Sequence, residues 1–134
     1  MKTKTIKQKT ILPAEPNVVY KTLMNAKAHS SFTGSEANIK DKAGAKFTAY
    51  GGYIEGKNLK LVKGKKIVQS WKAAETNWPE GHFSRVTFEL KKKGNGTEII
   101  FTHSHVPAAN AKSISNGWKS YYWNPMKEYF NKKK

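Results

Sequence analysis

The sequence contains no cysteine, only one arginine and no apolar run long enough to span a membrane. Without cysteine, the chain can form neither disulfides nor thiolate metal sites, and it has no thiol nucleophile. This composition fits a reducing cytoplasm. A membrane-spanning helix needs about 20 apolar residues. Residues 1–12 alternate lysine with threonine and lack the apolar segment of a signal peptide. We therefore expect a cytoplasmic protein with no membrane partner.

Acidic residues are also scarce, with 9 against 25 lysines and arginines, which gives a net charge of +16. Arg85 is the sole arginine, so the guanidinium fork favoured for phosphate and base recognition is nearly missing. We therefore disfavour nucleic acid as a partner. The lysines gather at residues 2–9, 57–66, 91–93 and 132–134 and are expected to be mostly solvated. Such clusters also suit docking on an acidic protein, and our candidates for this contact are Lys60, Lys63, Lys65 and Lys66.

The length of 134 residues, with 37% hydrophobic and 12% aromatic residues, predicts one domain over residues 1–134 with one core. Glycine, asparagine and proline separate segments of alternating and of helical pattern. The expected order is a strand at 4–12, helices at 17–24 and 26–32, strands at 36–40, 45–50, 53–62, 66–74, 82–91 and 97–105, and a long helix from Asn110 or Ser113 to Asn131. This order predicts an α+β fold in which a curved antiparallel sheet wraps a long C-terminal helix.

Aromatic residues recur at three- and four-residue spacing on the last helix, which indicates one apolar face. Pro125 lacks a backbone N–H and should kink this helix, and strand alternation should turn Trp71 toward it. Core packing is the usual role of such a face, but a mixture of tryptophan and tyrosine also suits a cavity wall. Our candidate ligand-binding residues are Trp71, Trp78, His103, Ile114, Trp118, Tyr121, Tyr122, Pro125 and Tyr129.

No group of titratable residues converges on a reaction centre in the sequence. His103 and His105 should share one face of a strand, but no third ligand accompanies them, so no metal site is expected. Glu80 and His82 offer an acid–base pair, although a turn in which Trp78 folds back onto the sheet explains the same residues better. We therefore expect no catalytic residues, no metal and no cofactor.

Several motifs occur in one order along nearly the whole chain. Residues 77–87 read NWPEGHFSRVT, residues 50–56 read YGGYIEG and residues 117–127 read GWKSYYWNPMK. Together with Trp71, they resemble the signature of the activators of the heat-shock protein 90 ATPase, specifically their C-terminal domain. The resemblance implies a helix-grip fold, also called START-like, birch-pollen-allergen-like or SRPBCC. It also implies a chaperone partner, and more distant relatives of this superfamily bind apolar small molecules.

The leading hypothesis is a non-enzymatic binding domain that contacts a chaperone-type partner or holds an apolar ligand between sheet and helix. One alternative is a polyketide-cyclase-like enzyme that uses the same cavity, and another is a nonspecific nucleic-acid binder. In the eukaryotic co-chaperones an N-terminal domain also grips the chaperone. We therefore expect these 134 residues alone to bind weakly and to stimulate the ATPase little.

Overall fold

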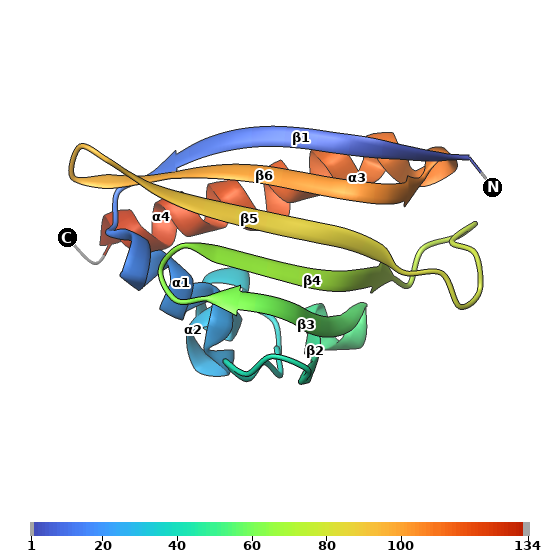
Figure 1. The fold of residues 1–134 in the computed structure, drawn as a ribbon, viewed down its shortest axis with the longest axis horizontal. Helices are drawn as coiled ribbons and strands as arrows, with labels where there is room; N and C mark the ends of the chain where they lie inside the picture. The colour runs from blue at the N-terminus through green and yellow to red at the C-terminus, as the bar shows by residue number, and fades with distance from the viewer. Residues whose placement is uncertain (1, 133–134) are drawn as a thin grey trace.

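A computed structural model describes residues 2–132 and shows one curved antiparallel sheet. Its six strands lie in the order β1-β6-β5-β4-β3-β2 (Figure 1). The sequence neighbours β2 to β6 form a meander, and β1 returns beside β6 to complete the sheet. The strands are β1 (Thr3–Leu12), β2 (Lys46–Ala49), β3 (Ile54–Val62), β4 (Lys66–Ala73), β5 (Ser84–Lys93) and β6 (Gly96–Pro107).

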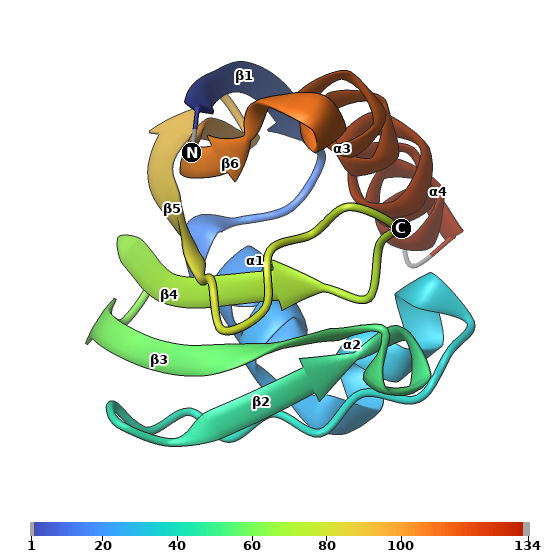
Figure 2. The same ribbon diagram turned by 90° about the vertical axis from the view of Figure 1, so that its right-hand side faces the viewer.

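The helices lie on the concave side of the sheet, as the end-on view in Figure 2 shows. The chain enters α1 (Pro16–Met24) through a proline at its first position, where the missing N–H costs nothing. Then α2 (Ala26–Thr33) follows, capped by the Asn25 side chain and closed by Gly34 in the left-handed conformation. The C-terminal α3 (Ala111–Trp118) and α4 (Asn124–Lys132) cross the sheet, and α2 packs against α4. This is the predicted α+β helix-grip fold.

The segment 36–40, predicted as a strand, pairs with the sheet only through a single bridge between Asn38 and Thr48. The side-chain amide of Asn58 donates instead to the carbonyls of Lys40 and Lys42, at 2.8 and 3.1 Å. Because a side chain satisfies these backbone groups, no strand partner is needed there. The prediction of a strand at 36–40 was therefore wrong, and β5 begins at Ser84 rather than at His82.

The long C-terminal helix changes its winding just before Pro125. Residues Lys119–Trp123 form a π-helical turn, in which the N–H of Asn124 bonds to the carbonyl of Lys119. Pro125 has no N–H to offer the carbonyl of Tyr121, and the Tyr50 hydroxyl donates to that carbonyl at 2.5 Å. The sequence predicted a kink at Pro125, and the irregularity lies in the turn that precedes it.

The π-helical turn shifts the buried face of the helix by one residue. Tyr121 is 60% exposed, although the spacing of the sequence placed it on the apolar face. Trp123 and Met126, which that spacing left out, are buried instead. Met126 follows the buried Tyr122 by four residues, as an ordinary helical face allows, whereas Trp123 follows Tyr122 directly and lies in the π-helical turn, so the extra residue there accounts for its burial.

Aromatic rings fill the space between the sheet and the helix. Trp118 is 3% exposed, and its ring lies 4.4 Å from Phe101 and 5.8 Å from Trp71 between centroids. Trp71 therefore faces the long helix, as the strand register predicted. A cavity in the centre, beside residues such as Met24 and Trp118, holds only about 10 Å³. The middle of the fold is a packed core.

We predict that Trp118→Ala lowers the free energy of unfolding by about 3–5 kcal/mol, because it opens a cavity in a filled core. Urea denaturation measures this loss. Lys119→Ala, at an exposed position next to it in the chain, should change stability by less than about 0.5 kcal/mol. Equal stability of the two variants would contradict the packing of Trp118.

Candidate binding sites

His103 lies at the centre of a buried hydrogen-bond chain that joins the helix to the sheet. The indole N–H of Trp118 donates to His103 Nδ1 at 3.0 Å, so this nitrogen accepts and carries no proton. His103 Nε2–H then donates to Ser84 Oγ at 2.7 Å, and the Ser84 hydroxyl donates to the carbonyl of Trp71 at 2.9 Å. With a neutral imidazole at His103, each donor and acceptor in this series of hydrogen bonds has a partner.

The direction of these bonds decides whether Ser84 and His103 can act as a nucleophile and its base. A general base must accept the hydroxyl proton, whereas His103 Nε2 donates to the hydroxyl. A catalytic histidine is also oriented by an acceptor at its other nitrogen, whereas the neighbour of Nδ1 is the Trp118 donor. Ser84 is 2% exposed and His103 is 0% exposed. The pair is built as a structural link.

His103 and His105 do not share a face of β6, and that prediction was wrong. Two residues of β6 stand opposite one residue of β1 at a bulge between Lys4 and Ile6. His105 adopts a positive φ of 61° and is exposed, while His103 is fully buried. The bulge shifts the alternation by one residue, which sequence spacing does not reveal. Among residues 2–132, no three histidine or carboxylate side chains gather as a metal site.

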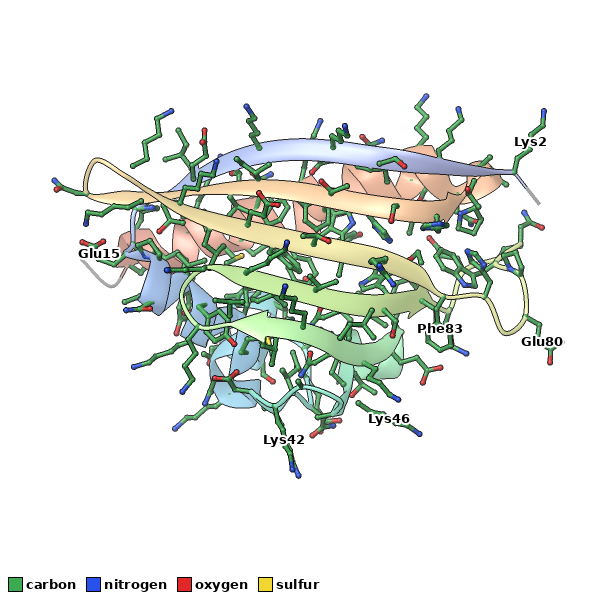
Figure 3. All side chains as sticks on the ribbon, viewed as in Figure 1. Lys2, Glu15, Lys42, Lys46, Glu80 and Phe83 are labelled. Carbon is green, nitrogen blue, oxygen red and sulfur yellow. The ribbon has the colours of Figure 1, made fainter. Side chains whose placement is uncertain are left out.

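The loop between β4 and β5 folds back onto the sheet. Trp78 is half-buried, and its ring meets Trp71 edge-on with 5.8 Å between centroids. Its indole N–H donates to the carbonyl of His82 at 2.9 Å, and His82 Nε2 donates to the carbonyl of His105 at 2.7 Å. Glu80 points away at the tip of this loop (Figure 3). The loop therefore holds His82 in a structural bond rather than beside a carboxylate.

A pocket of about 480 Å³ opens at one end of the fold, between α3 and the start of β3. Four predicted ligand-binding residues line it, namely Ile114, Trp118, Tyr121 and Tyr122. Trp71 and His103 lie in the core, Trp78 lines an adjoining hollow, and Pro125 and Tyr129 are half-buried farther along the helix. Sequence analysis missed six lining residues: Ser113 and Gly117 on α3, and Tyr50, Tyr53, Ile54 and Glu75 on the other side of the pocket.

Tyr50 and Tyr53 were missed because they appeared only as the ends of two strands. The 3₁₀ turn Tyr50–Gly52 between β2 and β3 turns both rings toward the helix. Burial, and then the neighbouring Tyr121, raise the pKa of Tyr50 to about 12. Burial, the Glu75 carboxylate and Tyr121 raise the pKa of Tyr53 above its ordinary value. The Tyr53 hydroxyl is therefore hydrogen-bonded to the Glu75 carboxylate at the pocket, while the Tyr50 hydroxyl donates to the carbonyl of Tyr121.

A second exposed feature is the hairpin at residues 59–66, which we call the basic hairpin. Lys60, Lys63 and Lys65 are exposed, Lys66 is half-exposed, and none of the four has an ion pair within residues 2–132. Gly64 holds the turn at φ 71°, where a Cβ would lie 2.1 Å from Asn17 Oδ1. The hairpin is thus seated closely against the start of α1. Lys133 and Lys134 of the last predicted cluster lie outside the described residues.

The basic hairpin also carries apolar side chains among its lysines. Leu59 is 42% exposed and Val62 is 37% exposed. Leu59 lies at an irregularity in the pairing of β3 with β4, between Asn58 and Lys60. An apolar centre with a charged rim is the usual anatomy of a protein interface. The four predicted docking lysines and these two side chains belong to one hairpin.

The fold and its motifs define a helix-grip domain of one family. Residues 13–131 match the family model described as "Activator of Hsp90 ATPase homolog 1-like protein", and the chain belongs to this family. An activator of 90 kDa heat shock protein ATPase homolog from Dictyostelium discoideum is 32% identical over 96% of the chain. Homolog 1 from Homo sapiens is 30% identical over 86% of it. The chain spans about a third of each of these two relatives, 33% of their length.

A solved structure gives the same assignment. The crystal structure of an HSP90 activator from Plasmodium falciparum aligns with a TM-score of 0.86 at 26% identity. The alignment covers 95% of this chain and 96% of that one, so the whole helix-grip architecture is shared. Within residues 2–132, no helix is both long and apolar enough to cross a bilayer.

The buried His103 makes stability depend on pH. Burial lowers its pKa to about 3 from an ordinary value of 6.5, and burial also lowers the pKa of His29. The unfolded chain takes up these protons below about pH 6.5 while the folded chain stays neutral. The contribution of His103 to the free energy of unfolding is therefore fully present above about pH 6.5 and falls toward pH 3, by up to about 1.4 kcal/mol per pH unit, and His29 adds a loss of the same sign.

Urea denaturation between pH 7 and pH 4 measures this slope. We expect His103→Gln to be less stable than the parent at pH 7. It should also lose less stability on acidification, because the unfolded chain can no longer take up a proton at position 103. His105→Gln, at the exposed neighbouring position, should keep the parent slope. Parallel curves for the parent and His103→Gln would show that His103 is not held neutral by the fold.

Proposed function

We propose that this chain is a non-enzymatic binding domain that docks on an acidic surface of a chaperone of the heat-shock protein 90 type. The observation that carries the proposal is the basic hairpin on a fold shared with the activators of that chaperone's ATPase. The family match supports the kind of partner, and the unpaired lysines support the sign of its surface. His103 is buried, and its Nδ1 accepts a hydrogen bond from the Trp118 indole, which supports a role in binding rather than catalysis.

The basic hairpin is suited to fast, charge-steered association. Its four docking lysines add to a net charge of +16, and no carboxylate within residues 2–132 pairs with them. Exposed charges of this kind raise the rate of encounter more than the final affinity. Leu59 and Val62 then offer apolar area for the contact itself. Weak, salt-sensitive binding is the expected behaviour of such a surface.

We predict that Lys63→Glu, Lys65→Glu and Lys66→Glu together lower the association rate with purified heat-shock protein 90 by about tenfold at low salt. The parent rate should fall steeply as salt reduces the Debye length below about 8 Å. Stopped-flow kinetics measures both effects. The triple variant should fold normally, because exposed lysines contribute little to stability.

The matched control reverses the same number of charges on the opposite sheet edge, at Lys2, Lys4 and Lys7. All three are exposed, and Lys2 lies at the far end of β1 (Figure 3). It should slow association by less than about threefold. If the two triple variants slowed association equally, the net charge of the domain, and not the basic hairpin, would account for the steering. Calorimetry without heat at low salt and near-millimolar protein would remove the chaperone proposal.

A second candidate function is the binding of a small molecule in the pocket beside α3. Its volume of about 480 Å³ lies in the range of small-molecule sites, and its walls are mostly aromatic and aliphatic. Because the centre of the fold is filled, a ligand would lie at this end rather than under the whole helix. This candidate is independent of the basic hairpin, which lies at the other end of β4.

A further inference from the structure

Carboxylates gather at the pocket although the chain is strongly basic. Among residues 2–132, Glu75 is the one charged residue that lines the pocket, and no lysine does so. An adjoining hollow shares Tyr53 and Glu75 with it and adds Glu55 and Glu80. Lys72 is the single lysine of that hollow, and it is paired with Glu55 at 2.8 Å. Three of the chain's 9 acidic residues therefore lie at this end, with one neutralised.

The aromatic rings at the mouth of the pocket are arranged around the same carboxylate. Tyr50 and Tyr121 meet edge-on with 5.8 Å between centroids, and Tyr121 is 60% exposed. The π-helical turn keeps Tyr121 at the rim, and its carbonyl is fixed by the Tyr50 hydroxyl. Tyr53 is 38% exposed, lines the same pocket and lies beside Glu75. A ligand in this pocket meets aromatic rings and a carboxylate together.

We propose that the pocket binds an organic cation, namely a flat or bulky apolar group that carries an amine. This deepens the second candidate function and rests on it. The ring faces of Tyr50, Tyr53 and Tyr121 carry negative electrostatic potential and attract ammonium groups. The Glu75 carboxylate supplies the matching charge. The apolar part of the ligand then packs against Ile114 and the edge of Trp118, deeper in the pocket.

The net charge of the chain favours an anionic ligand, whereas Glu75 favours a cationic one. The distance of each charge from the ligand decides which effect is larger. A chain of charge +16 attracts anions at long range. At physiological salt the Debye length is about 8 Å, so distant lysines are screened while a carboxylate in contact with the ligand is not. An anionic ligand would bring its charge to Glu75 without a lysine in the pocket to offset the repulsion. The pocket therefore selects against the charge that the rest of the surface favours.

The test uses three probes that share one indole ring: tryptamine, which is cationic, tryptophol, which is neutral, and indole-3-acetate, which is anionic. Each is titrated into the labelled full chain at pH 7 and 0.15 M salt, and chemical shifts of Tyr53, Gly117 and Tyr121 are followed. Tryptamine should bind about 3- to 10-fold more tightly than tryptophol, from one ring–cation contact and one partly exposed ion pair. Indole-3-acetate should bind most weakly.

Two variants assign the preference to its residues. Glu75→Gln keeps the size of the side chain and should reduce the preference for tryptamine over tryptophol to the part that the ring–cation contact supplies, while the affinity for tryptophol changes by less than about twofold. Tyr121→Leu keeps apolar area at the rim and should weaken tryptamine more than tryptophol. Glu128→Gln is the matched control on α4, at an exposed carboxylate outside both hollows, and should leave all three affinities unchanged.

The outcomes separate the inference from the function beneath it. Equal binding of all three probes, or a preference for tryptamine that Glu75→Gln leaves unchanged, would overturn the cation inference and leave a pocket for small apolar molecules. No shift with any probe at millimolar concentration would overturn both. Tighter binding of indole-3-acetate would show that the surface lysines set the charge preference of the pocket and would also overturn the inference. None of these results bears on the basic hairpin.

Discussion

The hydrogen bond from the Trp118 indole to His103 fixes how the long helix lies on the sheet. It joins α3 to β6, and Ser84 extends it to the backbone of β4. Because both imidazole nitrogens are used, the helix cannot rotate or slide without leaving a buried polar atom unpaired, at a cost of about 1–3 kcal/mol. The rings around Trp118 then fill the centre of the fold. A helix held this closely leaves room for a ligand only at one end.

The irregular helix decides what that end looks like. Pro125 frees one carbonyl, the π-helical turn adds one residue, and the Tyr50 hydroxyl takes the freed carbonyl. Tyr121 stays at the surface while Trp123 and Met126 turn into the core. The same local defect thus completes the core and exposes the aromatic rim, as π-helical turns often do near binding sites.

Much of the fold follows from local sequence patterns. Turn residues and alternation located all six strands β1 to β6, and the resemblance placed them in the correct architecture. The missed features are those in which one residue replaces a regular pattern. Asn58 takes the place of a strand partner, a bulge separates His103 from His105, and a π-helical turn shifts the face of the helix. Only part of the pocket lining was predicted for the same reason, since Glu75 and Tyr53 lie in loops whose bends bring them to the pocket.

The charge of the chain is divided along β4, and this division gives the two proposed sites different partners. Lys66 begins the strand beside the basic hairpin, and Ala73 ends it beside the carboxylates of the pocket. Eight residues of strand separate the two ends by roughly 23 Å, which is well beyond the Debye length of about 8 Å at physiological salt. Each end therefore acts as its own electrostatic surface. Under the two proposals, an acidic partner surface would be attracted at the hairpin and repelled at the carboxylates, so the same pattern that would direct docking to one end would leave the pocket free for a cation at the other.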